Sequence, residues 1–237
     1  MLSSFLSLYI ASTLGKQPDY NLIKTAGIGF SELKSTENKP IKDPSMISPI
    51  IRAKSSIVTD LTSNEVLYEK NSHQERAIAS ITKLMTMLII LDENKPDDIV
   101  TVSNNAAKTE GSTMFLRAGE KITVENLIYG SLINSANDAA VALAEHNAGS
   151  VHKFVEKMNK KATELQLLDS HFSNPIGLDN GDNYSSAYDV AKMAQYLYQN
   201  NFIKKAAKIK KMDVRSVSGN LTHKLESTNE LLGSYLK

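Results

Sequence analysis

Apolar side chains recur at helical spacing over residues 77–91, and this pattern predicts a mostly buried helix. The positions on its apolar face are Ile81, Leu84, Met85, Leu88 and Ile89. Ser80 begins this helix, and Lys83 follows one turn later on the same face. The positive end of a helix favours a developing alkoxide, and desolvation by apolar neighbours favours a neutral lysine amine. We therefore interpret the pair as a nucleophile with its own general base.

The rest of the chain divides into strand-like and helix-like segments. Strands are expected at 56–60, 65–69, 99–102, 212–217 and 221–225. Helices are expected at 124–133, 138–146, 151–167, 187–198 and 201–208. The first two strands predict a β-hairpin, and so do the last two. Strands at both ends of the chain with helices between them predict an α+β fold.

The N-terminal region favours export. Residues 2–14 form an apolar stretch that is too short to span a bilayer comfortably. Its length suits the apolar part of a secretory signal, although no Lys or Arg precedes it and no clear Ala-x-Ala site follows. We interpret residues 1–16 as a partial signal or membrane-anchor segment, with an ordinary buried strand or helix as the alternative. The proline-containing residues 17–50 predict a linker or extended lead-in, and the folded domain is expected at 51–237.

Composition argues against several classes of function. The net charge of +1 over 237 residues gives no electrostatic case for nucleic-acid binding, and the absence of cysteine excludes thiol ligands. The five histidines show no ligand spacing such as His-Glu-x-x-His, so we expect no metal and no other cofactor. Residues 179–183 are acidic but lack the spacing and terminal glutamate of an EF-hand loop, and we interpret them as a turn.

The spacing of Ser80 and Lys83 carries little weight alone, because Ser-x-x-Lys occurs four times in this chain. A capping serine beside a surface lysine would explain any single match. Chemistry at a serine also needs a proton relay and an oxyanion site. The candidates lie at 134–140, where Ser135 could relay a proton and the amide of Asn137 could orient a substrate. Ser-x-Asn is equally common here, so a loop with a helix cap is the alternative.

Taken together and in order, these segments resemble the penicillin-recognising serine enzymes, which carry Ser-x-x-Lys and then Ser-x-Asn. Within that group the chain is similar to the low-molecular-weight D-alanyl-D-alanine carboxypeptidases from about residue 57 to the C-terminus. The segments that carry the resemblance are Ala79-Ser-Ile-Thr-Lys-Leu-Met-Thr86, Ser112-Thr-Met-Phe-Leu-Arg-Ala-Gly-Glu120, Ser131-Leu-Ile-Asn-Ser-Ala-Asn-Asp-Ala-Ala-Val-Ala-Leu-Ala-Glu145, Asn174-Pro-Ile-Gly-Leu178, Tyr184-Ser-Ser-Ala187 and Thr228-Asn-Glu-Leu-Leu232.

The resemblance implies a penicillin-binding, β-lactamase-like transpeptidase fold of the α+β class. Ser80 would attack the carbonyl between the two terminal D-alanines of a peptidoglycan stem peptide, and Lys83 would take the serine proton once its pKa is lowered from ~10.4 toward ~7–8. Ser135 would relay the proton, and Asn137 would bind the substrate. β-Lactam antibiotics would acylate the same serine. The implied location is the periplasm or cell envelope, with membrane association left open.

The third motif of these enzymes, Lys-Thr-Gly, does not occur in this sequence. The resemblance places it on a strand after 228–232, so we expect an incomplete catalytic domain whose C-terminal sheet strands are missing. Two other interpretations stay open. One is a non-catalytic envelope protein that binds penicillin or peptidoglycan, or an inert fragment. The other is a class A β-lactamase, which is disfavoured because Ala136 replaces the aspartate of Ser-Asp-Asn and no glutamate occurs between Leu165 and Tyr188.

Overall fold

The computed structural model describes residues 39–41, 43, 45, 47–178 and 182–232. Its helices and strands lie in one compact unit, within residues 44–59 and 66–237. Residues 60–65 belong to the chain's other unit, where the Asp60 carboxylate accepts hydrogen bonds from the backbone of Thr62 and Ser63. The segment expected to be a signal or anchor lies outside the described residues. Within the described ranges, no helix has the length and apolar character needed to cross a membrane.

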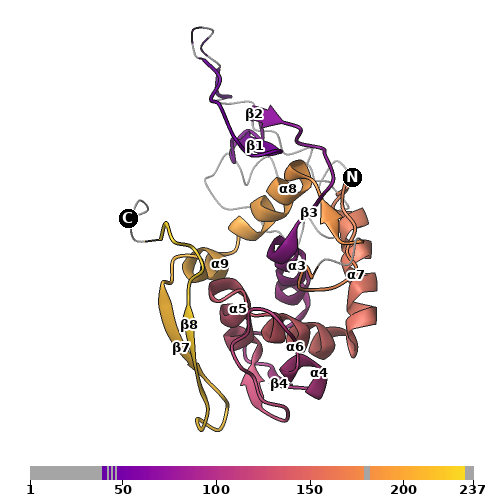
Figure 1. Ribbon diagram of the computed structural model, residues 1–237, viewed down its shortest axis with the longest axis vertical. Coiled ribbons are helices and arrows are strands. Elements are labelled where there is room, and N and C mark those ends of the chain that lie inside the picture. Colours follow the sequence, from indigo (N-terminus) through magenta and orange to yellow (C-terminus); the bar gives the residue numbers. More distant parts are fainter. Residues whose placement is uncertain (1–38, 42, 44, 46, 179–181, 233–237) are drawn as a thin grey trace, which may run out of the picture. The chain divides into compact units, whose positions relative to one another are not determined.

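The helices pack around one that is rich in alanine. They are α3 (Lys83–Glu93), α4 (Asn104–Ala107), α5 (Val124–Ile133), α6 (Asn137–Ala148), α7 (Val151–Glu164), α8 (Ala187–Tyr198) and α9 (Asn201–Ala206). Helix α6 contacts α3, α4, α5 and α7 (Figure 1). Its small side chains let these neighbours approach closely, so most of α6 is buried. The buried core includes Leu143 of α6 together with Met85, Leu127, Phe154 and Phe172.

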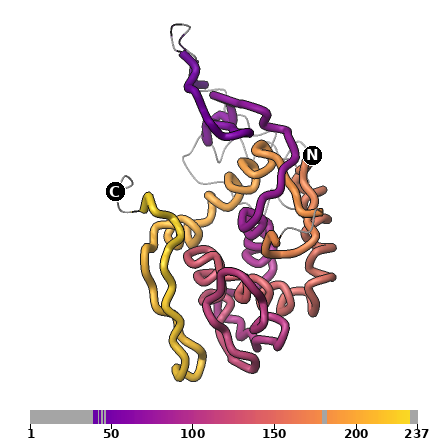
Figure 2. The backbone as a smooth tube through the Cα atoms, viewed as in Figure 1, coloured from indigo at the N-terminus to yellow at the C-terminus, as the bar shows by residue number. Residues whose placement is uncertain are grey.

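The described strands form four antiparallel pairs of two strands each. They are β1 (Ser56–Thr59) with β2 (Val66–Lys70), β3 (Arg76–Ala77) with β6 (Tyr184–Ser185), β4 (Ile99–Thr101) with β5 (Lys121–Thr123), and β7 (Lys211–Arg215) with β8 (Thr222–Glu226). Figure 2 follows β7 and β8 as one long hairpin, and both strands contact α5. In that hairpin Val214 is paired with His223, and both side chains are buried.

The structure confirms the predicted α+β class and the order of the longer elements. The helices expected over 124–133 and 187–198 have the expected bounds, and both predicted hairpins are present. The helix expected over 151–167 is shorter and ends at Glu164. The sequence analysis missed α4, β3, β5 and β6. These elements have two to four residues, which is too short for hydrophobic periodicity to reveal them.

The expected start of the first helix needs a correction. Ser80 lies in a short 3₁₀ helix, η2 (Ala79–Thr82), and the α-helix begins only at Lys83. Ile81, expected on the buried face, is 45% exposed. A 3₁₀ turn advances the chain by a larger angle per residue than an α-helix, so the apolar face of α3 does not extend back to Ile81. Met85, Leu88 and Ile89 are buried as expected.

Candidate active site

Ser80 and Lys83 meet at the junction between η2 and α3. The Lys83 Nζ atom lies 3.0 Å from the Ser80 Oγ atom, which is hydrogen-bond distance. Ser80 is exposed, whereas Lys83 is only 3% exposed. The pair therefore presents its hydroxyl to solvent and keeps its amine inside the fold, as a nucleophile and its base require.

Burial lowers the pKa of Lys83 from 10.5 to about 8. Removing an ammonium group from water disfavours its charged form, and no ion pair among the described residues compensates it. The position at the start of α3 acts in the same direction, because the positive end of a helix repels a cation. The Ile176 carbonyl, 3.3 Å from the Lys83 Nζ atom, is a hydrogen-bond acceptor for this amine. A large fraction of Lys83 is therefore neutral slightly above neutral pH.

Ser135 approaches Lys83 from the loop between α5 and α6. Its Oγ atom lies 3.4 Å from the Lys83 Nζ atom, so the lysine contacts both serines that the sequence analysis selected. The Ser135 backbone has a φ of +54°, a left-handed conformation that non-glycine residues rarely adopt. Such strain persists only where the surrounding structure fixes the backbone, and it is concentrated at functional sites.

Asn137 begins α6 and is buried. Its backbone N–H donates to the Ser112 carbonyl at 2.7 Å, and its side-chain Nδ2 atom donates to the Glu110 carbonyl at 2.8 Å. An amide nitrogen carries two hydrogens, so one donor of the Asn137 side chain is not used by this bond. A Cβ atom at Gly111 would lie 2.7 Å from the Asn137 Nδ2 atom, so the glycine makes room for the amide.

The loop at 174–177 supports the Ser80–Lys83 pair from the other side. The Thr86 hydroxyl donates to the Pro175 carbonyl at 2.7 Å. Gly177 has a φ of +83°, and a Cβ atom there would lie 1.7 Å from the Ala79 carbonyl oxygen. Only glycine allows this approach. The sequence analysis quoted Asn174-Pro-Ile-Gly-Leu178 as part of the resemblance but gave it no role; a glycine after Asn-Pro-Ile was the available signal.

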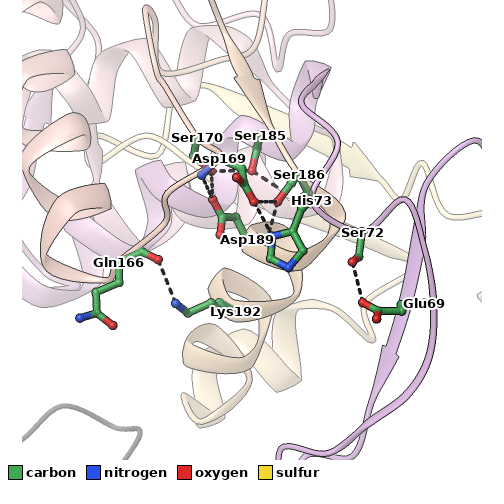
Figure 3. Close-up of polar contacts among 10 residues, drawn as sticks. All are labelled: Glu69, Ser72, His73, Gln166, Asp169, Ser170, Ser185, Ser186, Asp189 and Lys192. Carbon is green, nitrogen blue, oxygen red and sulfur yellow. Dashed lines mark hydrogen bonds and ion pairs between the residues drawn. The ribbon is translucent and has the colours of Figure 1, made fainter.

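A buried carboxylate, Asp189, holds the segment that leads to Ser80. Its Oδ2 atom accepts hydrogen bonds from the Asp169 backbone N–H at 2.9 Å and from the Ser170 hydroxyl at 2.7 Å (Figure 3). The Ser170 hydroxyl also lies 2.7 Å from the Ser185 hydroxyl in β6. Strand β6 pairs with β3, which directly precedes η2. This network therefore fixes the chain on its way into the site.

The described residues contain no cluster of three or more histidine, cysteine or carboxylate side chains that could hold a metal ion. The four site residues that the sequence analysis selected lie in two groups. Lys83 contacts Ser80 and Ser135 directly, and Asn137 follows Ser135 by two residues with its side chain bonded to the 110–112 loop.

Comparisons with known proteins point to one family. Residues 42–236 match the family model described as D-alanyl-D-alanine carboxypeptidase. The chain is 46% identical over 158 residues to D-alanyl-D-alanine carboxypeptidase DacF of Bacillus subtilis, covering 65% of this chain and 41% of that protein. It is 32% identical over 203 residues to the D-alanyl-D-alanine carboxypeptidase of Streptomyces sp. strain K15, covering 79% of this chain and 70% of that one.

Solved structures give the same result. Penicillin binding protein 6B from Escherichia coli matches with a TM-score of 0.72 and 34% identity, over 81% of this chain and 62% of that one. The Streptomyces K15 DD-transpeptidase matches with a TM-score of 0.74 and 31% identity, over 80% and 79% of the two chains. These matches confirm the predicted transpeptidase-like fold. The alignments to several of the curated relatives span only about two fifths of their length, as with the 41% of DacF.

Proposed function

The chain belongs to the D-alanyl-D-alanine carboxypeptidase family, and we propose that it is a serine carboxypeptidase that removes the terminal D-alanine of peptidoglycan stem peptides. The observation that carries the proposal is the 3.0 Å contact between the Ser80 Oγ and Lys83 Nζ atoms, with the lysine pKa lowered to about 8. A hydroxyl beside a neutral amine has a base ready to accept its proton.

In the acylation step, neutral Lys83 takes the Ser80 proton while the Ser80 oxygen bonds to the carbonyl carbon between the two D-alanines. The tetrahedral intermediate then breaks its C–N bond. The leaving amine of D-alanine needs a proton, and Ser135, whose Oγ atom is 3.4 Å from Lys83 Nζ, passes the proton from the lysine to it. What remains is an ester between the Ser80 oxygen and the shortened peptide.

In the deacylation step, water adds to the ester carbon and gives a proton to Lys83. The bond between that carbon and the Ser80 oxygen then breaks, Lys83 returns the proton to the Ser80 oxygen, and the shortened peptide leaves as a carboxylic acid. Asn137 positions the peptide through the amide hydrogen that the Glu110 carbonyl does not use. A β-lactam ring presents the same kind of carbonyl, so it acylates Ser80 as well. Peptidoglycan lies outside the cytoplasm, so the proposal includes export to the cell envelope.

The first test is intact-mass spectrometry of this chain after incubation with benzylpenicillin. We expect a mass increase of one penicilloyl group on the wild type and none on Ser80→Ala, because Ser80 is the exposed serine beside the Lys83 amine, at 3.0 Å. A folded wild-type chain that forms no adduct would rule out the serine mechanism for these 237 residues.

The second test is D-alanine release from a synthetic peptide that ends in D-Ala-D-Ala, with a peptide that ends in L-Ala as the control. Release from the first peptide alone supports the carboxypeptidase. A penicilloyl adduct without D-alanine release would instead favour a penicillin-binding protein without turnover.

A further inference from the structure

A second buried ionisable pair lies in contact with the chain segment that supports Ser135. The imidazole of His223, on β8, and the carboxyl of Glu120 are 5% and 1% exposed. The His223 Nε2 atom lies 2.7 Å from the Glu120 Oε1 atom, and the His223 Nδ1 atom lies 2.8 Å from the Met114 carbonyl oxygen. The mechanism proposed above uses neither residue.

The donors and acceptors around His223 and Glu120 determine where the protons of this pair lie. A carbonyl oxygen only accepts, so the Nδ1 atom of His223 carries a hydrogen and donates it to Met114. The contact between Nε2 and Glu120 then needs one more proton, since two lone pairs would otherwise face each other. That proton sits either on Nε2, giving an imidazolium and a carboxylate, or on the Glu120 carboxyl. Either way the bond holds a single shared proton.

Few other charges face this pair. The second oxygen of Glu120 accepts the Arg117 backbone N–H at 3.1 Å. On the hairpin, strand alternation leaves the charged side chains exposed while Val214, His223 and Leu225 are buried; the exposed ones are Lys211, Asp213, Arg215, Lys224 and Glu226. Lys121 in β5 is also exposed, and Glu125 in the first turn of α5 is half-buried. A further buried carboxylate, Asp138 of α6, binds the same 112–116 segment.

Asp138 and His223 bind the two backbone polar groups of the same residue, Met114. The Asp138 carboxylate accepts the N–H groups of Met114 and Leu116, each at 3.0 Å, while His223 donates to the Met114 carbonyl. The 112–116 segment, which includes Phe115 at a φ of +62°, is thereby fixed at its centre.

The 112–116 segment in turn holds both sides of Ser135. The Ser112 hydroxyl donates to the Asn134 carbonyl at 2.6 Å, and the Asn134 side chain donates to the Thr113 carbonyl at 2.8 Å. The Ser112 carbonyl accepts the Asn137 N–H at 2.7 Å. A chain of direct bonds thus runs from His223 through residues 112–114 to the residues next to Ser135.

We propose that His223 and Glu120 are positioning residues. Their hydrogen bond orients the imidazole that binds the Met114 carbonyl, and this holds the 112–116 segment and so sets the position of Ser135 against Lys83. The inference rests on the proposed function in one respect, which is the role of Ser135 as the proton relay. Without the bond to the Met114 carbonyl the segment relaxes, the strained backbone of Ser135 changes, and the 3.4 Å contact with Lys83 lengthens.

The test uses three variants of the whole chain. In Glu120→Gln the side-chain amide donates to the His223 Nε2 atom and its oxygen accepts the Arg117 N–H, so the geometry survives without a charge. His223→Leu removes the bond to Met114 and leaves the Glu120 Oε1 atom without its His223 partner. Glu120→Leu/His223→Leu removes both ionisable groups, so no buried charge is left alone if the single variant fails to fold. Lys224→Leu, at the next and exposed position of β8, is the matched control.

The first readout is the rate constant for acylation of Ser80 by benzylpenicillin. We expect His223→Leu and the double variant to be slower by about ten- to a hundredfold, since a displacement of about 1 Å can cost a hundredfold. Glu120→Gln and Lys224→Leu should stay within about twofold of the wild type. A folded His223→Leu chain that reacts at the wild-type rate overturns the proposal, and so does a Glu120→Gln chain that is as slow as His223→Leu.

The second readout does not depend on catalysis. Amide hydrogen exchange at Asn137, whose N–H binds Ser112, should be faster in His223→Leu and in the double variant but unchanged in Glu120→Gln and Lys224→Leu. If the wild type forms no penicilloyl adduct, the proposed function fails while this exchange still tests the positioning. Equal exchange at Asn137 in all chains overturns the positioning by itself.

Discussion

Helices α3 and α8 contact each other, and each carries a buried ionisable side chain in its first turn, Lys83 in α3 and Asp189 in α8. Asp189 places a negative charge at the positive end of its helix and accepts hydrogen bonds from Asp169 and Ser170. Lys83 places an amine at the same end of its helix, where a positive charge is repelled, and no described ion pair includes it. The negative charge of Asp189 is therefore favourable where it lies, whereas a positive charge on Lys83 is unfavourable.

The difference separates a structural group, Asp189, from a candidate functional one, Lys83. A buried carboxylate with matching donors contributes to the fold, because its charge is satisfied where it sits. A buried amine without a counter-charge is unfavourable in its protonated form, and its pKa falls to about 8. A protein keeps such a group when the neutral amine has chemistry to perform.

The largest expected effect comes from replacing Lys83, the buried amine without a counter-charge. Lys83→Met keeps the length of the side chain but cannot accept the Ser80 proton. We expect the rate constant for acylation of Ser80 by benzylpenicillin to fall by about 10²- to 10⁴-fold, the usual contribution of a general base. Intact-mass spectrometry over time measures this rate.

The control for this variant is Lys153→Met, which removes an exposed lysine from another Ser-x-x-Lys match, Ser150 to Lys153. Its acylation rate should equal that of the wild type. If Lys83→Met acylates as fast as Lys153→Met, then Lys83 is not the base.

The next effect concerns stability and its dependence on pH. Lys83 has a pKa of about 8 in the folded chain and 10.5 as its ordinary value. Below pH 8 both the folded and unfolded chains hold the proton, so the cost of the buried charge is constant at about 3 kcal/mol. Between pH 8 and 10.5 the unfolded chain binds more protons than the folded chain, so stability rises with pH through this window.

Urea unfolding of the wild type and Lys83→Met at several pH values isolates this effect, because all other groups titrate alike in both chains. Lys83→Met should be more stable at pH 7, and its advantage should shrink by about 2 kcal/mol by pH 9.5. A stability difference that does not change between pH 7 and 9.5 would mean that the pKa of Lys83 is not lowered in the folded chain.

The long elements of this fold could be predicted from sequence because their signals are local. The apolar face of α5 lies within the helix that it specifies, and the capping residue Ser186 directly precedes α8. Ile81 shows the limit, since its spacing fits the helical pattern but the chain there forms a 3₁₀ turn. Gly177, almost a hundred residues away, packs closely against Ala79 at the start of that turn, and this approach leaves no trace in the local pattern.

The residues of the candidate site also differ in how far the sequence could reveal them. The pair Ser80 and Lys83 is three residues apart, so its contact follows from helical geometry alone. Ser135 could be selected only as part of a set of motifs, because its distance from Lys83 depends on how α5 and α6 pack. His223 could not be selected at all. Its role depends on bonds to Met114 and Glu120, about a hundred residues earlier in the chain.

The third prediction concerns Asp189, the buried carboxylate at the positive end of α8. Asp189→Ala leaves the Asp169 N–H and the Ser170 hydroxyl without their buried acceptor, and we expect a loss of about 2 kcal/mol in the free energy of unfolding. Asp189→Asn is the control, since one amide oxygen can accept both bonds and only the charge at the helix end is lost, at about 0.5 kcal/mol. Urea unfolding distinguishes the two, and equal losses would show that the charge rather than the hydrogen bonds matters.

The smallest effect is expected at the outer end of the same network. His73 binds the Asp169 Oδ2 atom at 2.8 Å (Figure 3). It also stacks on Tyr188, but its side chain is 62% exposed. Water replaces the contacts of an exposed pair at little cost, so His73→Ala should lower the free energy of unfolding by less than about 1 kcal/mol. Urea unfolding beside Asp189→Ala provides the comparison. A loss as large as that of Asp189→Ala would contradict this expectation. It would show that the exposed His73–Asp169 pair contributes as much to stability as the buried Asp189 carboxylate and supports it.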